Sequence, residues 1–136
     1  MLIWGTANPT GMDATDYDGL YLTDTDIDSM ADSMHGKPVK IEHKGNSVGK
    51  VLSSWKYDGR LDILIDVDSD NIEAALINEF VRSGKCNEFS LGYKVNMSAA
   101  NNGALRTVGA KEAVEVSIVM KGARNNCFIR GFCLKK

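Results

Sequence analysis

The sequence predicts a mainly β protein of the α+β class, a bent, closed or nearly closed β-barrel with about two peripheral helices. Three observations predict this fold. Short segments alternate apolar and polar residues, turn-forming residues separate them, and two segments carry apolar residues at helical spacing. Because short strands joined by short turns favour a barrel over a sheet built from strand–helix–strand units, we expect the strands to close on one another.

The N-terminal part predicts one strand and one helix. We expect a strand at Leu2–Ala7 and a loop over Asn8–Asp18, which is rich in Asn, Pro, Gly and Asp. Thr23–Met34 is expected to form a short helix, with Thr23 or Thr25 near its N-cap and aspartates in its first turn.

Three strands are predicted next. Pro38–His43 alternates apolar residues with polar ones and is followed by a predicted turn at Lys44-Gly45-Asn46. Ser47–Trp55 and Leu61–Asp68 are separated by Tyr57-Asp58-Gly59, which is typical of a hairpin.

The remaining elements are a second helix and three strands. The helix is predicted at Asn71–Ser83, where Ile72, Leu76 and Phe80 share one apolar stripe. Met97–Thr107 is expected to be an exposed loop. The last strands are predicted at Glu88–Val95, Ala113–Met120 and Asn126–Leu134.

Composition indicates a single domain over residues 1–136. Hydrophobic residues make up 43% and charged residues 25%, which is typical of a globular core that needs no metal or disulfide. No apolar run is long enough to span a membrane, and a net charge of −2 does not indicate a nucleic-acid partner. Three cysteines without metal-ligand spacing predict reduced thiols in a cytosolic compartment, with no metal or cofactor.

Two residues are candidates for a nucleophile and its base. The chain has two histidines, and His35 is expected to end a helix, which leaves His43. Ser90 is flanked by Phe89 and Leu91, which would pack the strand and hold Ser90 on its opposite face. A nucleophilic serine needs a base within hydrogen-bond reach and a group that orients this base. Taken alone, each residue is also compatible with a structural role.

A third, acidic member could be Glu112 or Glu115. Strand alternation places Glu115 on the same face as Ser117. A carboxylate inside an apolar strand is costly unless it is paired, which favours Glu115 as the group that orients His43. The alternative is a glutamate that faces solvent. Cys86 is another nucleophile candidate, although no motif supports it and free cysteines are commonly core residues.

Three blocks of the sequence resemble the capsid-maturation proteases, which are the tailed-phage prohead proteases and the herpesvirus assemblins. The first block is Pro38–His43 followed by Val48-Gly49-Lys50-Val51, similar to the family's His strand and its Val-Gly-Arg/Lys-Val segment. The second is Phe89-Ser90-Leu91-Gly92-Tyr93, similar to the nucleophile strand. The third is Val114–Val119 followed by Gly122-Ala123-Arg124-Asn125, similar to the Glu-x-Ser-x-Val … Ala-Asn block of prohead proteases. Their order and spacing over residues 36–130 carry the resemblance.

This resemblance implies a serine protease with a bent β-barrel fold. His43 would be the general base, Ser90 the nucleophile and Glu115 the third member, with Glu112 as the alternative. Assemblins use a second histidine as the third member, and no histidine follows His43 in this chain. The segment that matches the oxyanion-binding region of assemblins, which have one more arginine there, is Gly122, Ala123 and Arg124.

The implied function is cleavage of the capsid scaffold and of the enzyme's own precursor through an acyl-enzyme. Its partners would be scaffold and capsid proteins inside an assembling procapsid in the host cytoplasm, and assemblins would suggest a homodimer. A different class of function is a non-catalytic β-barrel of the virion, such as a capsid-decorating or scaffold-interacting protein. A third is a small ligand-binding barrel. A separation of more than roughly 5 Å between Ser90 and both ring nitrogens of His43 would favour the structural barrel.

Overall fold

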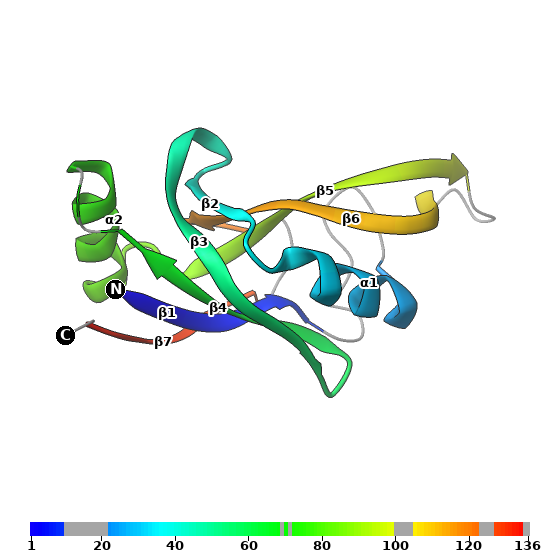
Figure 1. Ribbon diagram of the computed structural model, residues 1–136, viewed down its shortest axis with the longest axis horizontal. Coiled ribbons are helices and arrows are strands. Elements are labelled where there is room, and N and C mark those ends of the chain that lie inside the picture. The colour runs from blue at the N-terminus through cyan, green and yellow to red at the C-terminus, as the bar shows by residue number, and fades with distance from the viewer. Residues whose placement is uncertain (10–21, 69, 71, 100–104, 123–126, 135–136) are drawn as a thin grey trace.

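The computed structural model describes residues 1–9, 22–68, 70, 72–99, 105–122 and 127–134, and side chains in these ranges except 94–99 and 105–112. Within these ranges, seven strands form one sheet that two helices flank (Figure 1). In chain order the elements are β1 (Leu2–Asn8), α1 (Asp24–Met34), β2 (Pro38–Ile41), β3 (Lys44–Tyr57), β4 (Arg60–Val67), α2 (Ile72–Arg82), β5 (Glu88–Ala99), β6 (Leu105–Val119) and β7 (Ile129–Cys133).

The sheet curls until its two edges meet. Its strand order is β5-β6-β2-β3-β4-β1-β7, and neighbouring strands are antiparallel except β2 and β6, which are parallel. A single bridge joins Glu88 of β5 to Phe128, just before β7, and the Phe89 N–H donates to the carbonyl of Cys127 at 2.8 Å. The predicted bent, nearly closed barrel is therefore confirmed.

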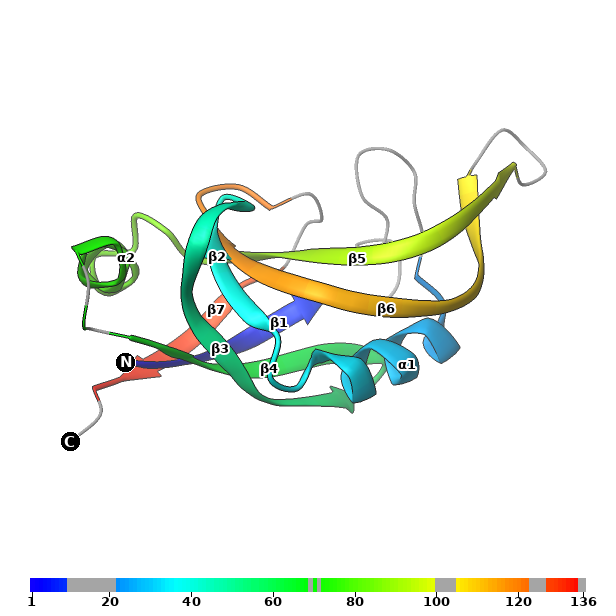
Figure 2. The same cartoon turned by 45° about the horizontal axis from the view of Figure 1, so that its top comes forward.

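Alternating residues of the strands fill the inside of this barrel. On β4, Leu61, Ile63, Ile65 and Val67 are each at most 1% exposed, as the alternation in the sequence predicts. The helix α1 packs along β6 (Figure 2), where the Ser33 hydroxyl accepts the backbone N–H of β6 residue 113 at 3.0 Å. Neither α1 nor α2, the helices of the described residues, has the length and apolar content to cross a membrane.

The ends of α1 follow the signals in the sequence. Thr23 is the N-cap: its Oγ1 accepts the Asp26 N–H at 3.2 Å, and the Asp26 carboxylate accepts the Thr23 N–H at 2.8 Å. This reciprocal capping box decides between the two predicted caps, Thr23 and Thr25. His35 is the C-cap, as predicted, and is followed by Gly36 with a φ of +78°.

The helix α2 lies within its predicted range but turns a different face to the core. Of the predicted apolar stripe, Ile72 is 86% and Leu76 51% exposed. The buried residues of α2 are Ala74, Ile77 and Val81. These are also spaced at three and four residues, so helical spacing alone does not decide which apolar face meets the core.

The hairpin between β3 and β4 is confirmed, whereas the turn after β2 is not where the sequence predicts it. Asp58 and Gly59 connect the paired residues Tyr57 and Arg60, with φ values of +51° and +76°. The turn predicted at Lys44-Gly45-Asn46 is wrong, because Lys44 already belongs to β3 and the preceding two residues make the turn.

The loop predicted over Met97–Thr107 is wrong at both of its ends. β5 continues to Ala99 and β6 begins at Leu105, and these two residues pair with each other. Backbone pairing along this hairpin, which projects from the sheet in Figure 1, outweighs the weak strand propensity of the sequence there. Most of the loop predicted over Asn8–Asp18 lies outside the described residues, although Asn8 itself ends β1.

The capping box makes a prediction about stability. We expect Thr23→Ala to lower the free energy of unfolding by about 1 kcal/mol, because the Asp26 N–H in the first turn of α1 loses the hydroxyl oxygen that accepts it. Thr25 is exposed in the same first turn, so Thr25→Ala is the matched control and should change the stability by less than about 0.5 kcal/mol. Urea denaturation measures both variants, and equal losses would contradict the assignment of the cap.

Candidate active site

Ser90 lies on β5 with its side chain on the face opposite the core. Its neighbours Phe89 and Leu91 are buried, as predicted, and Phe89 is fully enclosed in the barrel. Across the strand pair, Ser90 lies directly opposite Ser117 of β6. The face of this strand pair opposite to Phe89 therefore carries two serines side by side, both of them buried.

His43 lies in the two-residue turn between β2 and β3, which we call the Glu42–His43 turn. Both residues have left-handed backbone angles, with φ of +50° and +59°, as in a type I′ turn. Left-handed angles cost about 1–2 kcal/mol for each residue other than glycine. The sequence placed His43 at the end of a strand, and the structure instead places it on a strained turn.

Three hydrogen bonds to β6 and the residue after it hold the Glu42–His43 turn. The Glu42 N–H donates to the carbonyl of Ile118 at 3.3 Å, and the His43 N–H donates to Ser117 Oγ at 2.9 Å. The Met120 N–H donates to the Glu42 carboxylate at 2.9 Å. At about 1 kcal/mol each, these bonds offset the strain of the turn and fix the direction of the His43 ring.

Both ring nitrogens of His43 have partners. Nε2 lies 2.8 Å from Ser90 Oγ, and Nδ1 is hydrogen-bonded to Oε1 of Glu115. A carboxylate only accepts hydrogen bonds, so it assigns the ring proton to Nδ1. Nε2 is then left with its lone pair toward the Ser90 hydroxyl, which is the arrangement a general base requires.

Glu115 extends from β6 into this site and is 7% exposed. Its two oxygens are used separately: Oε1 meets His43 Nδ1, and Oε2 accepts the hydroxyl of Ser117 at 2.8 Å. A buried carboxylate without partners would be strongly unfavourable, and these two contacts provide them. The alternative of a glutamate facing solvent is wrong for Glu115, whereas the side chain of Glu112 lies outside the described residues.

The predicted oxyanion segment is described only at its first residue. Gly122 is buried, and its N–H donates to the Glu88 carboxylate at 3.1 Å. Ala123 and Arg124 lie outside the described residues. The Gly122 amide is therefore engaged within the protein, and the assignment of an oxyanion site to this segment stays a prediction.

Cys86 and His35 lie apart from this arrangement. Cys86 is 4% exposed, and burial raises the pKa of its thiol, with the nearby Glu42 carboxylate adding to the rise. Both nitrogens of His43 are engaged with Ser90 and Glu115, so His43 is not positioned to activate this thiol. His35 ends α1 as its C-cap.

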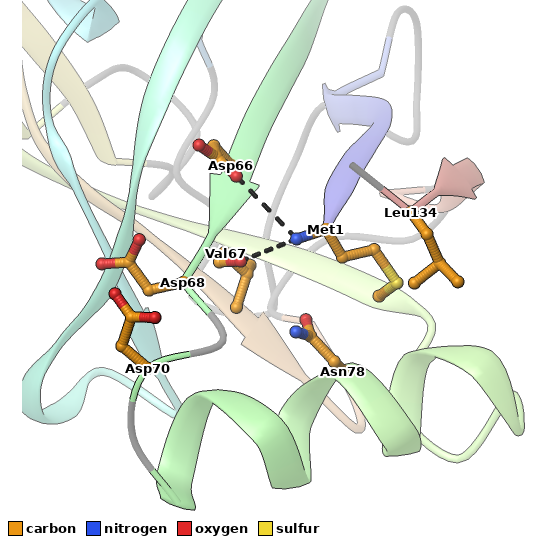
Figure 3. A pocket seen from close by; sticks show the side chains of 7 residues that line it. All are labelled: Met1, Asp66, Val67, Asp68, Asp70, Asn78 and Leu134. Atoms are coloured by element: carbon orange, nitrogen blue, oxygen red, sulfur yellow. Dashed lines mark hydrogen bonds and ion pairs between the residues drawn. The ribbon is translucent and has the colours of Figure 1, made fainter. Parts of the chain in front are cut away.

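Two cavities flank α2. An apolar cavity of about 210 Å³ lies between α2 and the Glu42–His43 turn. A second cavity, of about 280 Å³, is lined by Met1 and by Asp66, Asp68 and Asp70, of which Asp66 lies beside the amino group of Met1 (Figure 3). That amino group donates to the carbonyl of Val67 at 2.8 Å and lies 3.8 Å from Asp66 Oδ1. Among the residues whose side chains are described, no group of three or more His, Cys, Asp or Glu is arranged to hold a metal ion.

Comparison with solved structures finds a similar fold in a crystal structure of KSHV protease in complex with a hexapeptide phosphonate inhibitor. The TM-score is 0.59 and the sequence identity 14%. The match covers 94% of this chain and 63% of the other, so this chain spans less than two thirds of its neighbour's length. At this identity the likeness shows the fold alone. The expected resemblance to herpesvirus proteases is thus confirmed for the fold. No family model and no curated protein matches the sequence.

Sequence reasoning singled out His43, Ser90 and Glu115, which the structure brings together, but it assigned no role to Ser117 or Gly92. Strand alternation placed Ser117 on the same strand face as Glu115, but it predicted no hydrogen bond for the Ser117 hydroxyl. Gly92 lies opposite Glu115, and a Cβ there would be 2.3 Å from Glu115 Oε1. The available signal was the spacing, since Ser117 follows Glu115 by two residues and Gly92 follows Ser90 by two, which places each pair on one face of a strand.

The burial of Cys86 makes a prediction about thiol reactivity. Because the thiolate is the reactive form and the pKa of Cys86 is raised, we expect Cys86 to react slowly with iodoacetamide near pH 8 and faster as the pH rises. Cys133 is exposed and should react first. Timed alkylation of the native protein followed by peptide mass spectrometry measures both rates. Alkylation of Cys86 as fast as Cys133 would show an activated thiol and contradict this picture.

Proposed function

We propose that this protein is a serine endopeptidase that cleaves capsid scaffold and its own precursor during capsid maturation. The observation that carries the proposal is the hydrogen-bond chain from Ser90 through His43 to Glu115. The fold supports it further, because the structural neighbour is a protease. The sequence blocks around the same residues provide the link to capsid maturation.

The proposed acylation step uses the geometry as it stands. His43 Nε2 accepts the Ser90 proton while Oγ forms a bond to the carbonyl carbon of the substrate peptide. The resulting imidazolium is stabilised by Glu115 at Nδ1. Collapse of the tetrahedral intermediate breaks the carbon–nitrogen bond, and the proton passes from Nε2 to the leaving amine. The product is an ester between Ser90 and the N-terminal part of the substrate.

The second step is hydrolysis of this ester. The His43 side chain is 42% exposed, so water has access to Nε2. His43 accepts a proton from water, the hydroxide attacks the ester carbon, and the proton returns to Ser90 Oγ as the acid product leaves. The segment Gly122, Ala123 and Arg124 is proposed to bind the oxyanion in both steps, after the Gly122 N–H exchanges its Glu88 partner for the substrate oxygen.

The alternative function is a non-catalytic barrel of the virion. A wide separation of Ser90 and His43 would have favoured it. The separation of 2.8 Å gives the alternative no such support. Self-cleavage, a homodimer and a location inside the assembling procapsid belong to the proposal and derive from the family resemblance.

A fluorophosphonate probe tests the nucleophile without a known substrate. The expected result is one adduct on Ser90, in which an Oγ–phosphorus bond forms and fluoride leaves. We expect Ser90→Ala to remove the adduct. Ser53, an exposed serine of β3, provides the control, and Ser53→Ala should leave labelling unchanged. Intact-protein and peptide mass spectrometry measure the adduct, and its absence from the wild type at high protein concentration would favour the non-catalytic barrel.

Removal of the base, His43, should impair the same step as removal of the nucleophile, Ser90, which is the attack of Ser90 Oγ. We expect His43→Ala to slow the labelling of Ser90 by on the order of a thousandfold or more, because triad members act as a unit. A precursor that carries this domain, or a scaffold protein supplied with it, should be cleaved by the wild type and stay intact with either variant. Intact mass spectrometry measures cleavage, and processing by Ser90→Ala at the wild-type rate would refute the mechanism.

A further inference from the structure

The hydroxyl of Ser117 joins the two groups that must be oriented for His43 to act as a base. It accepts the backbone N–H of His43 at 2.9 Å and donates to Glu115 Oε2 at 2.8 Å. The residue is fully buried, at 0% exposure. Removal of this hydroxyl would leave the His43 N–H and Glu115 Oε2 without the partner that they have here, at a cost in free energy because the site is buried.

Gly92, on the neighbouring strand β5, determines the space that is available to the Glu115 carboxylate. It lies opposite Glu115 in the β5–β6 pair. A Cβ at this position would be 2.3 Å from Oε1 and 2.9 Å from the carboxyl carbon, which is closer than any contact allows. The Glu115 carboxylate therefore occupies the space that the missing side chain of Gly92 leaves.

We propose that Ser117 is a positioning residue for the His43–Glu115 pair, and that Gly92 provides the space in which this pair is held. The Ser117 hydroxyl fixes the Glu115 carboxylate directly. Through the backbone N–H of His43 it also fixes the imidazole that is hydrogen-bonded to this carboxylate. This inference rests on the proposed function for its catalytic meaning. Its structural content, the orientation of His43 by Ser117, can be measured without any activity.

The protonation of the His43 ring is the direct readout. Glu115 at Nδ1 selects the ring form with the proton on Nδ1, whereas a ring without this partner is free to carry it on Nε2. The chain has two histidines, so a sample labelled with ¹⁵N-histidine gives two sets of ring signals, and His35 serves as the internal reference. The ¹⁵N shifts, recorded at a pH where both rings are neutral, report which nitrogen of His43 carries the proton.

We expect Ser117→Ala to release the carboxylate and to reduce the ratio of the Nδ1–H to the Nε2–H form of His43 by about tenfold, the change that loss of one hydrogen bond produces. Labelling of Ser90 by the fluorophosphonate should fall by on the order of a hundredfold, as for a misplaced catalytic group. Ser33→Ala is the matched control, because the Ser33 hydroxyl also accepts a backbone N–H of β6, at 3.0 Å, but that N–H belongs to Ala113 and Ser33 contacts neither His43 nor Glu115 in the hydrogen bonds described. It should lower stability without changing the ring signals.

Gly92→Ala tests the same inference without touching a hydroxyl. The added methyl group meets the flexible end of Glu115, so the carboxylate must move and the His43 signals should change as they do in Ser117→Ala. Gly131→Ala is its control, because a Cβ there would meet the Trp4 ring at 2.4 Å, away from the site.

The outcomes separate the two claims. If Ser117→Ala and Gly92→Ala leave the His43 ring form unchanged, the positioning role is refuted, whether or not their stability falls. If the ring form changes while the wild type takes no adduct on Ser90, the positioning role stands and the proposed peptidase function fails. Equal changes in the ring form in Ser33→Ala or Gly131→Ala would also refute a specific role, because they would show a general loss of packing.

Discussion

The site depends on the parallel pairing of β2 with β6, the one parallel pair of the described sheet. In this register Ile41 lies opposite Ile118, and the Glu42–His43 turn follows Ile41 directly. β6 in turn pairs Ser117 with Ser90 of β5. Three segments that are distant in the sequence thus meet across adjacent strands, and a shift of β2 by one residue would turn His43 away from Ser90.

A second constraint is the burial of Glu115. A carboxylate at 7% exposure is stable only when its oxygens are paired, and here each oxygen has its own partner. Such a network is sensitive to the loss of any member, because the remaining groups are then buried without partners. The stability of this part of the barrel and the orientation of His43 therefore have the same physical origin. The strain of the Glu42–His43 turn is tolerated because β6 and the residue after it bind the turn through three hydrogen bonds.

Much of the fold was predictable from local pattern. Leu61 to Val67 alternate because one face of β4 enters the core, and Thr23 precedes Asp26 by the spacing of a capping box. The errors in the strand boundaries have one cause. The paired strands between Met97 and Thr107, and Lys44 at the start of β3, contain residues that favour turns, and backbone pairing across each hairpin overrides that preference. In α2 two apolar stripes were available, and contact with the barrel selected the one through Ile77.

By itself, the sequence determined the strand set, both helices and the candidates His43, Ser90 and Glu115, because alternation, capping and the scarcity of histidine are local properties of the chain. The tertiary structure alone decided that these three side chains form one hydrogen-bond chain, that His43 lies on a left-handed turn, and that Ser117 connects the turn to Glu115. The physical reason is that hydrogen bonds between side chains require a geometry set by strand register, and register between distant strands is decided by the packing of the whole barrel.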